Sequence, residues 1–99
     1  MSSTRLVTVT SVSYPATANV TENTSDAFAP SSVDIARNGS VNFIFQSTAH
    51  NVTFDVHPGA PSNVGDTYNA TVSVTFNTAG SFGYQCTIHP GMTGTVVVR

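Results

Sequence analysis

Short stretches of alternating apolar and polar residues recur along the chain, separated by Gly, Pro, Asn and Ser. Alternation with a period of two is typical of half-buried β-strands, and no stretch of useful length shows the helical period. Breaks such as "RNGS" and "NTAGS" carry the residues that turns require. The strands that this pattern predicts are 5–13, 18–21, 32–36, 40–46, 50–56, 70–76, 80–86 and 93–98.

The pattern therefore predicts an all-β fold of about seven or eight strands, arranged as a sandwich or a barrel. Ninety-nine residues suffice for one domain with a real core and are too few for two, so we expect a single domain over 1–99. Two segments, 20–30 and 59–68, show no clear pattern, and either has room for a short helical turn. Neither bears on the function that we expect.

Composition narrows the classes of function. Only 8% of the residues are charged, lysine is absent, and the three arginines are scattered, so no basic stripe is available to follow a nucleic acid backbone. No apolar run approaches the roughly 18 residues that a membrane span needs. Residues 1–5 lack the apolar segment of a signal peptide. We therefore expect a soluble domain, without nucleic acid as a partner, that has been separated from its leader.

The stretch "CTIHPGM", residues 86–92, holds the only cysteine of the chain together with a histidine and a methionine. A single cysteine cannot form an internal disulfide, so Cys86 is a free thiol, a bridge between two chains or a metal ligand. A plain buried cysteine in the core is the ordinary alternative.

Side-chain parity places two of the candidate ligands on the core side of their strands. In "HNVTF" the valine and the phenylalanine mark the buried face, and His50 shares their parity. In "SFGYQC" the phenylalanine and the tyrosine mark it, and Cys86 shares theirs. His50 begins its strand and Cys86 ends its own. If the two strands are antiparallel neighbours, these two side chains meet.

His89 and Met92 follow in the turn after Cys86, which folds over the same end of the sheet. Two imidazoles, a thiolate and a weak thioether make a trigonal set that suits both oxidation states of copper, whereas zinc more often takes four strong ligands. Cys86 with His89 as a nucleophile and its base is an alternative, although no oxyanion hole or substrate pocket is evident. Each residue alone also has an ordinary structural explanation.

At these residues the sequence resembles the cupredoxins, the blue copper proteins that include plastocyanin and amicyanin. The resemblance runs from "FAPSSVDI" to the C-terminus, residues 28–99, with "AHNVTF" similar to the upstream ligand strand and "GYQCTIHPGMTGTVVV" to the ligand loop. The Cys-x-x-His-x-x-Met spacing is that of amicyanin. The resemblance implies a Greek-key β-sandwich with one copper ion per chain. It implies four metal ligands: His50, Cys86, His89 and Met92.

The resemblance also assigns residues around the ligands. Asn51 matches an asparagine whose side chain ties the two ligand segments together near Thr87. Ile88 stands where amicyanin and plastocyanin usually have proline, so it keeps a backbone N–H that we expect to reach the Cys86 sulfur and raise the reduction potential. His57 has no counterpart as a ligand and is expected to be a solvated loop residue.

The function that the resemblance implies is single-electron transfer between redox proteins, by a monomer that transforms no substrate. Its location is periplasmic or otherwise extracytoplasmic, and its partners dock at an apolar patch around His89. The expected frame of that patch is Pro90, Gly91 and Met92, with Ala49, Pro58 and Pro61 as further candidates. With so few charges, docking is expected to depend little on electrostatic steering. A copper carrier or storage module, and a metal-free interaction domain of the sandwich type, are the alternatives.

Overall fold

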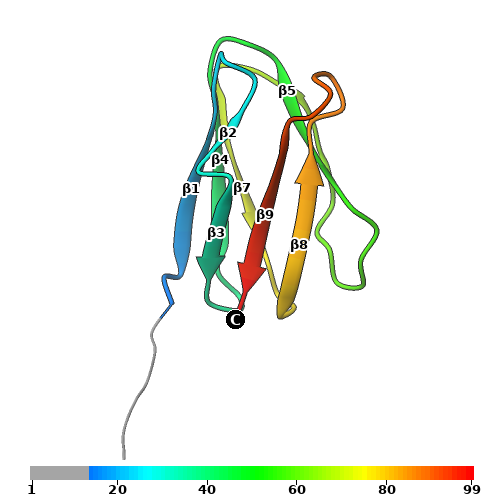
Figure 1. Ribbon diagram of the computed structural model, residues 1–99. Coiled ribbons are helices and arrows are strands. Elements are labelled where there is room, and N and C mark those ends of the chain that lie inside the picture. Colours follow the sequence, from blue (N-terminus) through cyan, green and yellow to red (C-terminus); the bar gives the residue numbers. More distant parts are fainter. Residues whose placement is uncertain (1–13) are drawn as a thin grey trace, which may run out of the picture.

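Two β-sheets face each other in the computed structural model, which describes residues 14–99 (Figure 1). One sheet has the strand order β2-β1-β4-β7 and the other β3-β9-β8-β5-β6. The strands are β1 (Thr17–Glu22), β2 (Phe28–Ala29), β3 (Ser32–Ile35), β4 (Ser40–Phe45), β5 (His50–Phe54), β6 (Val64–Thr67), β7 (Ala70–Thr75), β8 (Gly80–Gln85) and β9 (Thr93–Val98).

The connections cross between the sheets. β1 pairs with β4 and β3 pairs with β9 in parallel, and the other pairs are antiparallel. Several neighbours in each sheet are not consecutive in the chain, as Greek-key sandwiches require. The predicted all-β sandwich is confirmed. Within the described residues it has nine strands, where the sequence pattern predicted about seven or eight.

Seven of the predicted strands correspond to β1, β3, β4, β5, β7, β8 and β9, with ends that agree within one or two residues. The predicted strand at 5–13 lies outside the described residues. The sequence pattern missed β2 and β6, and the short helical turns that we allowed for in 20–30 and 59–68 were wrong. Both missed strands lie at sheet edges. β2 has two residues and β6 reads VGDT, so neither shows apolar alternation, and both form by pairing with a longer neighbour.

Alternating side chains of the two sheets fill the space between them. Val41, Phe43 and Phe45 are buried from β4, and Phe82 and Tyr84 are buried from β8. Burying each of these large side chains contributes roughly 1.5–3 kcal/mol. Because this core is built by the strands, the sandwich does not depend on the loop that follows Cys86.

The antiparallel pairing of β5 with β8 brings two distant segments to the same end of the sandwich. Thr53 lies opposite Gln85 and Phe54 opposite Tyr84, so the start of β5 lies beside the residue that follows β8. The first is His50 and the second is Cys86. Among the described residues, no helix has the length and apolar character that a membrane crossing requires.

Candidate metal centre

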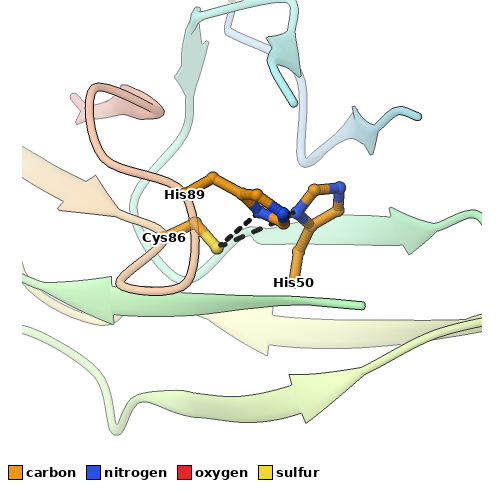
Figure 2. Close-up of side chains that lie close together, drawn as sticks. All are labelled: His50, Cys86 and His89. Carbon is orange, nitrogen blue, oxygen red and sulfur yellow. Dashed lines mark hydrogen bonds between the residues drawn. The ribbon is translucent and has the colours of Figure 1, made fainter. Parts of the chain in front are cut away.

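Three side chains from two strand ends and one loop converge at this end of the molecule (Figure 2). The Nδ1 atoms of His50 and His89 lie 3.1 Å apart, and each lies 3.8 Å from the Sγ atom of Cys86. His50 and Cys86 are buried and His89 is partly buried. The convergence that strand parity predicted for His50 and Cys86 is therefore present in the structure, and the loop brings His89 to it.

The spacing of the three atoms suits a transition metal. They form a triangle with sides of 3.1, 3.8 and 3.8 Å. The point equidistant from them lies about 2.1 Å from each, close to metal–imidazole bonds of about 2.0–2.1 Å and metal–thiolate bonds of about 2.3 Å. Two imidazoles and one thiolate combine borderline and soft donors, which is the donor set of copper sites that work in both oxidation states.

The His50 ring is held in place by a hydrogen bond at Nε2, the ring nitrogen remote from the centre. Its Nε2 atom lies 2.8 Å from the carbonyl oxygen of Asn23. A carbonyl oxygen can only accept a hydrogen bond, so Nε2 carries the proton and donates. In the neutral ring Nδ1 then has a free lone pair. This lone pair faces the Nδ1 atom of His89 and the Sγ atom of Cys86.

His89 is the member of the cluster with access to the surface, since its side chain is 25% exposed. Its Nε2 atom lies 3.5 Å from the Oδ1 atom of Asp26, a residue in the turn between β1 and β2. The ring packs edge-on against His50, with 4.8 Å between ring centroids. The two imidazoles thus share one arrangement, with Nδ1 toward the centre and Nε2 toward residues of the β1–β2 turn.

The Cys86 thiol is 2% exposed, and the backbone N–H of Asn51 donates to its sulfur at 3.4 Å. The Asn51 side chain then bonds to the residue after the cysteine. Its Nδ2 donates to Thr87 Oγ1 at 2.8 Å, and its Oδ1 accepts the Thr87 N–H at 3.1 Å. Nδ2 also donates to Asp66 Oδ1 at 3.0 Å. These hydrogen bonds link the start of β5 to the ligand loop at Thr87, as was expected of Asn51.

Met92 closes the loop. Its carbonyl oxygen accepts the N–H of Cys86 at 3.0 Å, and its own N–H donates to the His89 carbonyl oxygen at 3.2 Å. Its side chain is 3% exposed, so it belongs to the buried base of the loop and not to a surface patch. Gly91 has a φ of 87°, a left-handed conformation that glycine adopts without strain and that lets the short loop turn back.

Two expectations about neighbouring residues are corrected. Ile88 is 41% exposed, and in the described part of the chain the backbone donor to the sulfur is Asn51 and not Ile88. The loop that contains Pro58 and Pro61 leaves β5 at the end opposite His50, so these prolines do not frame His89 (Figure 1).

His57 lies apart from the metal centre, as expected. Its ring packs against Phe82 with 4.9 Å between centroids, near the start of β8, and its Nδ1 lies 2.9 Å from the Pro58 carbonyl oxygen. His57, although its imidazole could bind a metal, therefore lies at the end of β5 opposite His50.

Three residues that contact the centre or its support were not predicted from the sequence: Asn23, Asp26 and Asp66. Asn23 and Asp26 lie in the segment that showed no strand or helix pattern. Nothing in the sequence placed that segment over the histidines. Asp66 lies on β6, the edge strand that the pattern did not predict.

A buried carboxyl group lies in the core at Glu22, the last residue of β1. The Glu22 side chain is 0% exposed, and neither carboxylate oxygen has a hydrogen-bond partner among the described residues. Burial raises the pKa of Glu22 from 4.5 to about 8. Burial and the charge of Glu22 together raise the pKa of Tyr84 above its usual value, and the Tyr84 hydroxyl is likewise buried without a partner among those residues.

Comparison with known proteins connects this geometry to a family. Residues 15–99 match the sequence profile of the copper-binding proteins of the plastocyanin/azurin family. Amicyanin-alpha of Methylorubrum extorquens is 43% identical over 57 residues, which cover 54% of this chain and 48% of that protein. The match thus spans about half the length of this curated relative.

Solved structures extend the likeness to the whole fold. The reduced Cu(I) form of an amicyanin variant superposes with a TM-score of 0.70 at 26% identity, covering 92% of this chain and 86% of that one. A variant of fern plastocyanin superposes with a TM-score of 0.67 at 24% identity, covering 82% of this chain and 99% of that one, which shows a common fold.

Proposed function

Because this chain belongs to the plastocyanin/azurin family of copper-binding proteins, we propose that it carries single electrons between larger redox proteins through one copper ion. It transforms no substrate. The observation that carries this proposal is the convergence of two imidazole Nδ1 atoms and one thiol sulfur at metal-binding distances. Bound copper supplies a one-electron couple between Cu(I) and Cu(II).

The residues that hold the ion in this proposal are His50, Cys86 and His89, with Met92 as a weak fourth ligand. His50 is held by the Asn23 carbonyl and Cys86 by the Asn51 N–H, so two of the donors are fixed before any metal arrives. A preformed donor set limits rearrangement when the charge on the ion changes, which favours fast electron transfer.

In this proposal the electron passes between the copper ion and a partner protein through the His89 ring. The His89 side chain is 25% exposed, whereas the side chains of His50, Cys86 and Met92 are at most 3% exposed. A partner that contacts the His89 edge thus comes within one side chain of the metal, and no other proposed ligand offers such a path.

The docking surface in this proposal is a small apolar area around His89. Exposed side chains near it are Ile88 and Pro90 of the loop, and Tyr68, which follows the β6 residue paired with His50. Asp26 adds a negative charge directly beside the ring. Encounters at such a surface are brief, and the partner is a redox protein with an apolar face and a positive group opposite Asp26.

We further propose an extracytoplasmic location, such as a periplasm, and a monomer in solution. A lone thiol that is buried and committed to a metal is protected in oxidising surroundings. The three arginines and five acidic residues leave a net charge of -2, which gives no basic surface for nucleic acid.

Copper storage or delivery by the same ligands is the competing function. Cyclic voltammetry of the copper-loaded protein, combined with transfer to a chelator, separates the two. Electron carriage predicts a reversible one-electron couple and slow loss of copper. An irreversible couple with rapid release to the chelator would contradict it and favour delivery.

A further inference from the structure

Residues 23–27 form a tight turn between β1 and β2. The Asn23 side-chain oxygen accepts the N–H groups of Ser25 at 3.0 Å and Ala27 at 3.2 Å. The Asn23 N–H donates to the Ala27 carbonyl oxygen at 3.1 Å. The Asp26 N–H also donates to the Asn23 backbone carbonyl oxygen at 3.3 Å. Because four hydrogen bonds fix this turn around Asn23, the groups that it presents have defined positions.

The turn contacts the imidazoles of both histidines at the atom remote from the centre. The Asn23 carbonyl oxygen lies 2.8 Å from His50 Nε2, and the Asp26 carboxylate lies 3.5 Å from His89 Nε2. The turn therefore spans the two rings. His50 is held by a backbone group, while His89 is approached by a side chain.

His89 needs such a contact more than His50 does. His50 is fully buried in a strand, whereas His89 lies in a loop with a partly exposed ring. Carboxylates facing the remote nitrogen of a ligand histidine fix the tautomer and the ring orientation. Here the carboxylate favours the tautomer with the proton on Nε2, which leaves the Nδ1 lone pair pointing at His50 and Cys86.

We propose that Asp26 is a positioning residue for His89. Its carboxylate holds the ring with Nδ1 toward the centre, and its negative charge stabilises the more positive oxidation state of the ion. This inference rests on the proposed copper site and adds to it a residue that lies outside the two ligand segments. Loss of Asp26 then weakens Cu(II) binding and raises the reduction potential.

Backbone conformation decides which variants test the proposal. Asp26 has a φ of 57°, a left-handed conformation that glycine and asparagine tolerate and most residues do not. Asp26→Gly removes the side chain without backbone strain, and Asp26→Asn removes the charge but keeps an oxygen that can accept from Nε2. Asp34→Asn is the matched control, since Asp34, on β3, is a similarly exposed carboxylate that pairs with Arg99 and not with a histidine.

The experiment measures the Cu(II) dissociation constant by competition with a chelator and the reduction potential by voltammetry at one pH. We expect Asp26→Gly to weaken Cu(II) binding about tenfold, the lower end of the range for contacts of this kind, and Asp26→Asn to lose only about threefold because an acceptor oxygen remains. Both variants are expected to have a higher potential than wild type, and Asp34→Asn to have an unchanged one.

The outcomes separate this inference from the proposed function. A wild-type protein without a copper-thiolate band or a one-electron couple would overturn both. A normal wild type whose Asp26→Gly and Asp26→Asn variants match Asp34→Asn in affinity and potential would overturn the role of Asp26 alone. If Asp26→Gly does not fold, as judged by circular dichroism, the potential of Asp26→Asn decides, because a purely structural role predicts no shift in it.

Discussion

Asn51 and Thr87 are joined by two hydrogen bonds that run in opposite directions. The Asn51 side-chain Nδ2 donates to the Thr87 hydroxyl, and the Thr87 backbone N–H donates to the Asn51 side-chain Oδ1. One residue follows His50 on β5 and the other follows Cys86 in the ligand loop. This pair therefore sets the separation of two ligands that are far apart in the sequence, before any metal is bound.

Replacing Asn51 with alanine is expected to destabilise the metal-free protein and weaken copper binding. The side chain also donates to Asp66 and accepts from the Thr53 hydroxyl, so four hydrogen bonds are lost at about 1 kcal/mol each in a partly buried place. We expect a loss of about 2–4 kcal/mol in the free energy of unfolding, measured by urea denaturation.

Asn42→Ala is the control for this variant, because Asn42 makes a single exposed side-chain bond to Asn19. It should change the free energy of unfolding by less than about 1 kcal/mol. Equal effects of the two variants would mean that the Asn51 bonds do not stabilise the ligand loop.

Replacing His50 and replacing His57 are expected to differ sharply in their effect on copper affinity. His50→Ala removes a donor from the centre and should weaken Cu(II) binding by roughly a hundredfold or more. His57→Ala removes an edge-on contact with Phe82, worth about 1 kcal/mol of stability, and an exposed hydrogen bond to the Pro58 carbonyl oxygen, and should leave copper affinity unchanged. Isothermal titration with Cu(II) measures both. Similar copper affinities in the two variants would contradict the assignment of His50.

Glu22 makes stability depend on pH in a defined direction. Burial raises the pKa of its carboxyl group from 4.5 to about 8, so the folded state keeps a proton that the unfolded state releases. The free energy of unfolding therefore falls as the pH rises from about 4.5 to 8 and changes little through this group above that.

Glu22→Gln removes this titration while keeping the size of the side chain. Relative to wild type it should gain stability between pH 5 and 8, by several kcal/mol in total at roughly 1.4 kcal/mol for each pKa unit. Urea denaturation at several pH values measures the difference. Parallel pH profiles of wild type and variant would show that Glu22 is ionised in the folded protein.

The main features of the fold and most of the site follow from local sequence. Strands with apolar alternation, such as β4 and β8, were predicted because each buries one face. The same parity argument brought His50 and Cys86 together, since side-chain direction is fixed once the strand is. Their neighbours Asn51 and Thr87 were found only through resemblance to a family.

The remaining features depend on tertiary contacts that no local pattern encodes. β6 forms because β5 offers it a partner, although its own residues include Gly and Asp. Asp26 reaches His89 across 63 positions of sequence through the placement of the β1–β2 turn. The expectation that Pro58 and Pro61 frame His89 was wrong for a local reason, because both prolines follow the end of β5 opposite His50.

The Ile88→Pro variant tests whether the backbone N–H of Ile88, in the ligand loop, contributes to the reduction potential. The sequence suggested that its N–H reaches the sulfur, but the Asn51 N–H is the donor seen there. We therefore expect Ile88→Pro to leave the reduction potential unchanged within the error of voltammetry. A lower potential in the proline variant would show that the Ile88 N–H does bond to the thiolate in the copper-loaded protein.

The most direct test of the whole account is the visible spectrum during addition of Cu(II) to the metal-free protein. A thiolate bound to Cu(II) gives intense charge-transfer absorption that imidazoles and a thioether cannot supply. We predict a blue protein that saturates at one equivalent of copper, and a Cys86→Ser variant without the band. A colourless wild type, or a blue Cys86→Ser variant, would contradict the copper centre formed by His50, Cys86 and His89.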